Sequence, residues 1–390
     1  MKKLKIAYLL PNCDVSGGVA VVLQHSNRLK KRGHDVLVAT TDKVTKTNWF
    51  PNQSVPVITA QNLPADLDIL VATSWATAFA TAKIKAKHKC YFVQSDETRF
   101  HDYGNDFYHI TQLTYLMNYH YLTEARWLQR WLLENFDKTA TLIPNGLDSN
   151  IFYPTAPLEK RNNKFRILLE GAIWLPYKGV REAFDVVKDL DVEVWCISSY
   201  GKPESYWKCD RFFEKVPMTK MKEIYSSCDI LLKLSRVEGF FGPPLEMMAC
   251  GGVCVIGKVT GYDEYIVDGE NAIVVDPTNI DQARSAVLKI MEDRELREKL
   301  KKNGLETAKQ WDWEKSIDKL EQYFMEIAEN KYGQFNAVRQ QTNQSVAFFY
   351  DKLLSTSFDS NVMAHKLGKK IKSIWLKNFL KRIYFHMKSR

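Results

Sequence analysis

A chain of 390 residues with 45% apolar and 26% charged residues has a globular composition and enough length for two ordinary domains. Its net charge of +9 equals the number of basic residues at 366–390, a segment without acidic residues, so the neutral remainder argues against a nucleic-acid-binding body. The seven cysteines form no CxxC pair and cannot all pair within one chain. Neither a disulfide framework nor a zinc ribbon is therefore expected, and the reducing cytoplasm fits best.

The first half of the chain alternates strand-like runs of Val, Ile and Leu with amphipathic helical stretches. This rhythm predicts a parallel sheet with helices on both faces. The opening residues are interpreted as a strand rather than a signal peptide, because their apolar run is interrupted by Lys5 and ended by Pro11. A helix is expected over 19–32, closed by Gly33. Strands are expected at 5–11, 35–40, 55–60, 68–73, 89–94 and 140–144.

The stretch 143–154 has two prolines, Asn-Gly and Asp, a concentration of turn residues that predicts a domain boundary. A second strand series is expected beyond it, followed by helices at 280–293, 295–310 and 313–331, the last crossing back to the first domain. The predicted domains are 1–150 and 151–331, both Rossmann-like, and an extension at 332–390. The second strand series is 166–171, 192–197, 212–216, 229–234, 253–257 and 272–276.

Two carboxylates, Glu238 and Glu246, lie on either side of a loop that follows an apolar strand and precedes a helix starting near Pro243. Such a helix start attracts anions, and ligands of open α/β sheets bind at this end of the strands. Carboxylates accept hydrogen bonds from vicinal sugar hydroxyls. Taken alone, the pair is better explained by a solvated loop charge at Glu238 and a nearby basic partner for Glu246.

The segment Glu-Gly-Phe, two prolines and Leu-Glu-Met-Met-Ala-Cys-Gly resembles the donor-site signature of the family-4 retaining glycosyltransferases, also called glycosyltransferase group 1. The resemblance implies the GT-B fold, in which two Rossmann-like domains face a cleft. It implies that Glu238 binds the donor sugar, that Glu246 binds the ribose, and that backbone N–H groups around 239–242 contact sugar or phosphate. This chain has Phe241 where the family has glycine.

Further matches extend the resemblance over roughly the first 330 residues. Gly17 and Gly18 are similar to the glycine loop of the family's first domain, although a simple strand-to-helix turn is the alternative. In the turn from Gly171 to Gly179, Lys178 takes the place of the lysine that neutralises the leaving diphosphate, and a solvated surface lysine is the alternative. The family's arginine is Ala172 here, and Arg236 is a candidate substitute. The implied donor-binding residues are Gly17, Gly18, Gly171, Lys178, Arg236, Glu238, Gly239, Phe240, Phe241, Gly242, Leu245 and Glu246.

Polar residues also end a strand of the first domain. This strand is followed by Gln94, Asp96 and Glu97. A strand end at which Gln precedes acidic residues resembles that of bacterial polysaccharide-assembly enzymes, including rhamnosyltransferases. The interpretation places these three on the acceptor side and Asp96 with Glu238 and Lys178 in the catalytic group. An ordinary polar loop is about as good an explanation.

No cofactor and no metal are expected. The DxD pairs at 66–68 and 189–191 lie at strand entries, where Asp is common for turn reasons. The last segment alternates basic and apolar residues at helical spacing, which predicts peripheral attachment to an anionic membrane surface at the inner face of the cell membrane. Packing on the body is the alternative. Its basic residues are Lys366, Lys369, Lys370, Lys372, Lys377, Lys381, Arg382, Lys388 and Arg390.

The implied reaction is retaining transfer of a hexosyl or deoxyhexosyl group from a nucleoside-diphosphate sugar to a hydroxyl of a glycan, lipid-linked or protein-linked acceptor. In the family's front-face mechanism the departing phosphate oxygen takes the acceptor proton, so no side-chain base is required. Two other readings remain open. One is a catalytically silent GT-B-like binding or stabilising partner, and the other is a sugar-nucleotide epimerase of similar fold.

Overall fold

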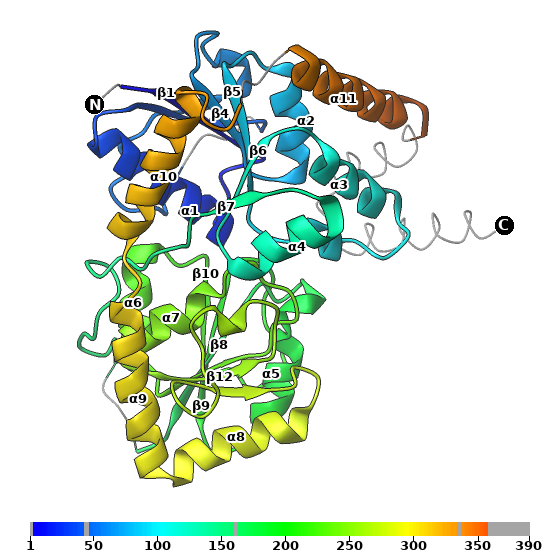
Figure 1. The fold of residues 1–390 in the computed structure, drawn as a ribbon. Helices are drawn as coiled ribbons and strands as arrows, with labels where there is room; N and C mark the ends of the chain where they lie inside the picture. The colour runs from blue at the N-terminus through cyan, green and yellow to red at the C-terminus, as the bar shows by residue number, and fades with distance from the viewer. Residues whose placement is uncertain (1–2, 43–46, 160–162, 334–336, 358–390) are drawn as a thin grey trace, which may run out of the picture.

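The computed structural model describes residues 3–42, 47–159, 163–333 and 337–357. Two α/β domains lie one above the other in Figure 1, each built on its own parallel sheet. The first sheet has the strand order β3-β2-β1-β4-β5-β6-β7 and the second the order β10-β9-β8-β11-β12-β13. This confirms the expected class of two parallel-sheet α/β domains. The last strand of the first sheet ends at Leu142 and the first strand of the second begins at Arg166, on either side of the boundary predicted near residue 150.

The strands are short, and the central ones are almost wholly buried, as expected of parallel sheets covered on both faces. One strand that we did not predict, β6, has the sequence His-Tyr-Leu-Thr, which lacks a long apolar run. The strands are β1 (Lys5–Leu10), β2 (Asp35–Thr40), β3 (Val57–Thr59), β4 (Ile69–Ala72), β5 (His88–Val93), β6 (His120–Thr123), β7 (Ala140–Leu142), β8 (Arg166–Glu170), β9 (Glu193–Ser198), β10 (Arg211–Glu214), β11 (Ile230–Lys233), β12 (Val253–Gly257) and β13 (Ile273–Val275).

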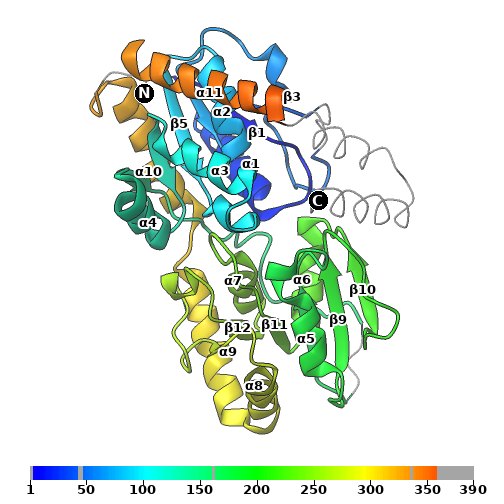
Figure 2. The same ribbon diagram turned by 90° about the vertical axis from the view of Figure 1, so that its right-hand side faces the viewer.

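Helices connect many of the successive strands and cover the sheets, as the perpendicular view in Figure 2 shows. In the first domain they are α1 (Gly17–Lys31), α2 (Trp75–Lys83), α3 (Asp106–Leu116) and α4 (Arg126–Phe136), with the 3-10 turns η1 (Ala60–Asn62) and η2 (Glu97–Phe100). In the second they are α5 (Val180–Val187), α6 (Met218–Ser227), α7 (Gly242–Ala249), α8 (Ile280–Glu292) and α9 (Arg294–Lys309), with η3 (Pro176–Lys178) and η4 (Tyr262–Glu264).

Helix α10 (Trp313–Ala328) follows the second domain in sequence but packs into the core of the first. Its buried face includes Ile317, Leu320 and Phe324, in one apolar cluster with β1 and α1. At its start the two connections between the domains lie side by side, because the Leu147 N–H donates to the Trp311 carbonyl at 3.2 Å. A Cβ on Gly146 would lie 2.4 Å from the backbone nitrogen of Trp313, so this close approach requires glycine.

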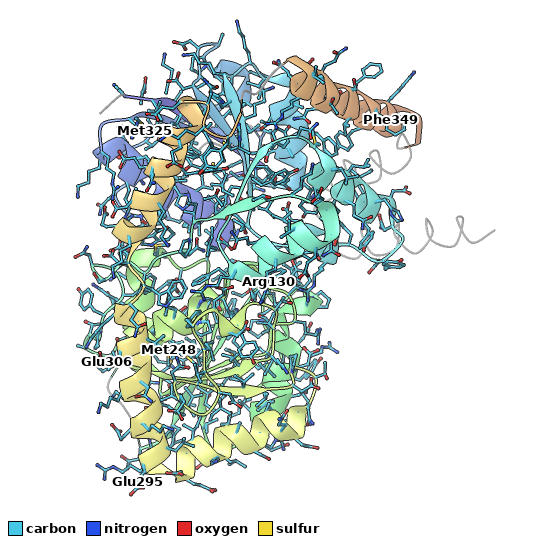
Figure 3. The ribbon with its side chains drawn as sticks, viewed as in Figure 1. Arg130, Met248, Glu295, Glu306, Met325 and Phe349 are labelled. Carbon is cyan, nitrogen blue, oxygen red and sulfur yellow. The ribbon has the colours of Figure 1, made fainter. Side chains whose placement is uncertain are left out.

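A further helix, α11 (Ala337–Ser357), packs against α2 of the first domain. The rings of Tyr350 and Phe79 stack at 4.1 Å, while Phe349 points away from the body in Figure 3. The predicted membrane-binding segment, 366–390, lies outside the described residues. In the part of the chain that the structure covers, no helix combines the length and apolarity needed to cross a membrane.

Candidate functional site

The candidate site lies where the carboxyl ends of strands from both sheets meet. The loop after β11 carries Glu238 and leads into α7, with Gly242 and Pro243 in the first helical turn. The loop after β8 carries Lys178 and leads into α5. Loops that follow β5 and β6 of the first domain contact the loop after β11 from the other side. Ligands of open α/β sheets bind at such strand ends.

Glu238 and Lys178 form an ion pair in which the Lys178 Nζ lies 2.8 Å from the Glu238 Oε2. The Lys233 Nζ lies 3.9 Å from the Glu238 Oε1, an oxygen that is buried without a hydrogen-bond partner. Burial alone would raise the pKa of Glu238, but the two ammonium groups outweigh it and hold that pKa below its ordinary value. Glu238 is therefore an ionised acceptor with one unused oxygen.

Lys233 is a functional candidate that sequence reasoning missed. Its side chain is 3% exposed at the end of β11, and its Nζ lies 2.6 Å from a carboxylate oxygen of Glu170. The ammonium also lies 5.9 Å from the centre of the Phe241 ring. A charged side chain is rarely buried unless it is paired. The available signal was the lysine within the apolar run Ile-Leu-Leu-Lys-Leu.

Glu246 lies on α7, where the Tyr225 hydroxyl of α6 donates to its Oε2 at 3.0 Å. Burial raises the pKa of Glu246 to about 7, although the Tyr225 hydrogen bond and the Lys233 charge both lower it. Glu238 and Glu246 both lie on the segment that follows the carboxyl end of β11, and the Lys233 charge lowers the pKa of each. A Cβ on Gly242 would lie 4.0 Å from the Glu246 Oε1, so the helix start adjoins this carboxylate.

The side chains of Phe241 and Leu245 lie in the core of the second domain. The Phe241 ring is fully buried, and the Phe241 carbonyl accepts a hydrogen bond from the Tyr265 hydroxyl. Phe240 is partly buried and packs on Tyr265 and Trp311. Only the backbones of Phe241 and Leu245 remain candidates for ligand contact.

Arg236 was the candidate for a second phosphate cation. Its guanidinium instead lies 2.7 Å from the Glu182 carboxylate of α5 and donates to the Pro176 carbonyl. Lys178 and Lys233 are the cations beside Glu238, and the proposed phosphate contact of Arg236 stays a prediction.

Two glycines of the predicted donor set, Gly18 and Gly171, occupy places of close approach, whereas a Cβ on Gly17 would meet no atom within 4 Å. Gly17 and Gly18 begin α1, which is capped by the Ser16 hydroxyl, and a Cβ on Gly18 would lie 3.2 Å from the Gln94 side chain. A Cβ on Gly171 would lie 2.8 Å from the Val180 side chain. Gly18 therefore adjoins Gln94 at the end of β5, while Gly171 allows the turn to pack on α5.

Of the acceptor-side residues, Gln94 lies at the domain boundary, but Asp96 and Glu97 point into the first domain. The Asp96 carboxylate caps η2 by accepting from the Thr98 N–H at 3.1 Å. Glu97 accepts from the Trp75 N–H at 2.6 Å and the Tyr91 hydroxyl at 3.1 Å, and burial raises its pKa to about 7. Both carboxylates are thus engaged inside the first domain, and the roles predicted for Asp96 and Glu97 stay predictions.

Glu124, which directly follows the unpredicted β6, is a second residue that sequence reasoning missed. It is 6% exposed and accepts hydrogen bonds from the Asn145 side chain at 2.9 Å and from the Phe240 N–H at 3.0 Å. Burial raises its pKa to about 8, against the effect of these two donors. Because β6 was not predicted, nothing in the pattern marked Glu124 as a strand-end residue.

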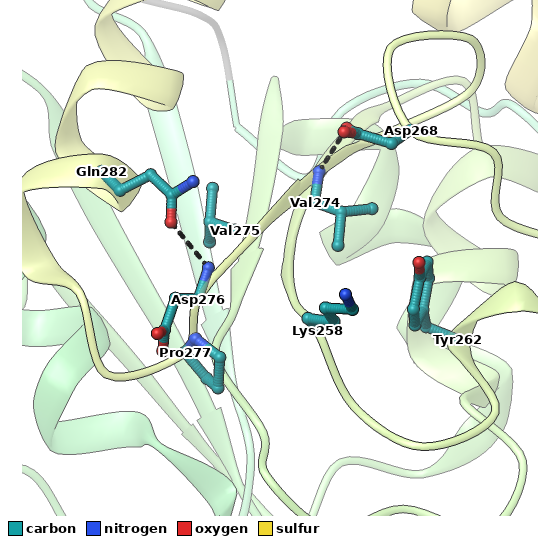
Figure 4. Close-up of a pocket in the computed structure, with 8 residues that line it drawn as sticks. All are labelled: Lys258, Tyr262, Asp268, Val274, Val275, Asp276, Pro277 and Gln282. Carbon is teal, nitrogen blue, oxygen red and sulfur yellow. Dashed lines mark hydrogen bonds between the residues drawn. The ribbon is translucent and has the colours of Figure 1, made fainter.

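A cavity of about 490 Å³ opens beside β12 and β13, apart from these residues. Figure 4 shows that its polar groups include Lys258, Tyr262 and Gln282, the last bound to the Asp276 backbone. It shares no residue with the predicted donor set. In the described ranges no three His, Cys, Asp or Glu side chains are grouped so that they could hold a metal ion.

Residues 210–307 match the family model described as glycosyl transferases group 1. The matched segment contains Glu238, Glu246 and the whole of α7, so it includes the glutamate pair of the candidate site.

Two curated relatives are similar over part of the chain. An uncharacterized glycosyltransferase of Methanocaldococcus jannaschii is 26% identical over 216 residues, 53% of this chain and 59% of the relative. The O-antigen chain mannosyltransferase B of Escherichia coli is 29% identical over 162 residues, 42% of this chain and 37% of the relative. The chain thus matches little more than half of the first relative's length and less of the second's.

A solved structure supports the fold over a greater length. The Anabaena protein HepE in complex with UDP-glucose superposes with a TM-score of 0.69 at 15% identity, covering 83% of this chain and 99% of that one. At this identity the likeness concerns the fold alone.

Proposed function

We propose that the protein is a retaining glycosyltransferase that moves a hexosyl or deoxyhexosyl group from a nucleoside-diphosphate sugar to an acceptor hydroxyl. The observation that carries the proposal is the Glu238–Lys178 ion pair at 2.8 Å, located at the carboxyl end of the second sheet beside Lys233 and Glu246. The match to glycosyl transferases group 1 covers the two glutamates and supports the same activity.

Each of these groups suits one part of a nucleotide sugar. The Lys178 ammonium can bind the diphosphate and offset the negative charge that grows when the bond to the sugar breaks. The free Oε1 of Glu238 can accept from a sugar hydroxyl, and Glu246, held by Tyr225, can accept from the ribose hydroxyls. Carboxylates that are ionised make the stronger acceptors.

The reaction we propose breaks the bond between the anomeric carbon and the diphosphate oxygen and forms a bond to the acceptor oxygen on the same face of the sugar. The departing phosphate oxygen takes the proton from the acceptor hydroxyl. The transition state would be oxocarbenium-like, as in glycoside hydrolysis. Contacts between the domains around Glu238 would exclude water and protect the donor from hydrolysis. The proposal requires neither a metal nor a cofactor.

For the acceptor we propose a glycan, lipid-linked or protein-linked hydroxyl in the assembly of bacterial cell-surface polysaccharide. The similarity to a relative named as an O-antigen chain mannosyltransferase supports this setting. Peripheral attachment at the inner face of the cell membrane through 366–390 would bring the site close to a lipid-linked acceptor.

The proposal is tested by thermal unfolding of the purified protein across a panel of UDP-, GDP- and dTDP-sugars, followed by transfer assays with the donor that stabilises it. A ligand that binds only the folded state raises the unfolding temperature with concentration. Glu246→Ala should remove the shift, whereas Glu298→Ala, on the exposed face of α9, should keep it. A wild-type protein that neither binds nor transfers any sugar would refute the proposal, and binding without transfer would favour the silent-partner alternative.

A further inference from the structure

Among the contacts between the two domains, the first domain hydrogen-bonds both the N–H and the C=O of one peptide bond next to Glu238. The Phe240 N–H donates to the Glu124 carboxylate at 3.0 Å, and the Gly239 carbonyl accepts from the Trp127 Nε1–H at 2.8 Å. These N–H and C=O groups are the two ends of the Gly239–Phe240 peptide. A peptide bond is planar, so two hydrogen bonds on its opposite sides fix the orientation of the plane.

Both first-domain groups are themselves held in place. The Asn145 side chain donates to the other oxygen of Glu124 at 2.9 Å. The Trp127 backbone N–H donates to the Glu264 carboxylate of the second domain at 3.1 Å. The Trp127 ring packs so closely on Gly261 that a Cβ there would lie 2.4 Å from the Nε1. The hydrogen-bonding groups are therefore supported from both domains.

Gly239 makes this approach possible. A Cβ at this position would lie 1.7 Å from the Gln94 carbonyl oxygen and 2.8 Å from a carboxylate oxygen of Glu124. Backbone does not give way at such distances, so any larger residue would force the domains apart. The loop that carries Glu238 thus lies directly against the ends of β5 and β6.

We propose that Glu124 and Trp127 are positioning residues that clamp the Gly239–Phe240 peptide and so fix Glu238 for donor binding only when the domains are closed. The inference rests on the proposed function, because it gives the clamp its purpose. Neither residue needs to touch the nucleotide sugar. Through the clamp, the position of the Glu238 carboxylate depends on the position of the first domain, and this domain would bind the acceptor.

Amide hydrogen exchange tests the clamp without any substrate. Glu124→Ala and Trp127→Phe each remove one bond to the peptide, and exchange in segment 238–241 should become faster by about tenfold or more. Trp131→Phe makes the same change one turn further along α4, where the ring packs against Tyr115, and should leave that segment unchanged. Unchanged exchange in both clamp variants would overturn the clamp.

Steady-state kinetics then test the positioning role. We expect kcat/KM for the nucleotide sugar to fall by roughly 10- to 100-fold in Glu124→Ala and Trp127→Phe, with the acceptor KM unchanged. Glu124→Gln should keep most of the wild-type kcat/KM. After the Asn145 side-chain amide flips, its unpaired Oδ1 can accept a hydrogen bond from the new Gln amide. Faster exchange with wild-type kinetics would overturn the positioning role. If the wild type uses no nucleotide sugar, the proposed function fails, and the exchange result alone shows whether the clamp exists.

Discussion

Replacing Lys233 with methionine removes the ammonium that lies between Glu170 and Glu238 but keeps most of the side chain's volume. The Lys233 Nζ lies 2.6 Å from the Glu170 carboxylate, and the two side chains are 3% and 19% exposed. The replacement therefore leaves Glu170 without its cation in a largely buried place, and it removes one of the two charges that hold Glu238 ionised.

Breaking a buried ion pair at one partner costs about 3 to 5 kcal/mol, because the other charge is left without compensation. The matched surface pair is Lys299–Glu270, in which the side chains are 46% and 55% exposed. An exposed pair of this kind contributes no more than about 1 kcal/mol. Lys233→Met should thus cost several times as much stability as Lys299→Met.

Urea unfolding followed by circular dichroism measures both free energies. The double variant Glu170→Met with Lys233→Met removes both charges, and we expect it to recover about 2 kcal/mol or more of the loss. The reasoning is refuted if Lys233→Met unfolds within about 1 kcal/mol of the wild type. It is also refuted if the double variant is less stable than the single one.

Three more predictions concern the site. Burial raises the pKa of Glu246 to about 7, from the ordinary value of 4.5 that applies in the unfolded chain. Between these two pH values the folded protein binds a proton on Glu246 that the unfolded chain does not bind. The stability that this proton contributes should therefore be fully present below pH 4.5 and be lost as the pH rises to about 7. Wild-type stability should therefore fall relative to Glu246→Gln by about 1 to 3 kcal/mol between pH 4.5 and 8, as measured by urea unfolding. Lys178→Met should weaken nucleoside-diphosphate binding by roughly 10- to 100-fold in titration calorimetry, while Lys188→Met, on an exposed position of the same domain, should not. Gly239→Ala places a Cβ 1.7 Å from the Gln94 carbonyl, so small-angle scattering should show a larger radius of gyration; an unchanged radius would contradict the close contact.

The sequence predicted most strands because buried parallel strands are continuous apolar runs bounded by turn residues. It missed β6, whose His-Tyr-Leu-Thr sequence is short and half polar. That omission also hid Glu124, because a residue is identified as a strand-end residue only when its strand is recognised. Helix α7 was placed correctly from Pro243, which fits the first turn of a helix.

The side-chain directions in the site could not be read from the pattern. Asp96 and Glu97 follow a strand end as expected, yet η2 turns their carboxylates into the domain. The ion pair of Glu238 with Lys178 joins residues 60 positions apart, and the burial of Phe241 depends on the packing of three helices and a sheet. Such contacts are set by tertiary packing and not by local spacing.

The paired connections at Gly146 and Trp313 have a mechanical consequence for the whole molecule. The two chain segments that connect the domains lie side by side and act as one pivot. Neither segment can move apart from the other without breaking the hydrogen bond from the Leu147 N–H to the Trp311 carbonyl. If the domains rotate about this place, the displacement of a residue grows with its distance from it. Cutting one crossing with a protease would leave the halves joined but would free them to swing in directions that the intact pivot forbids.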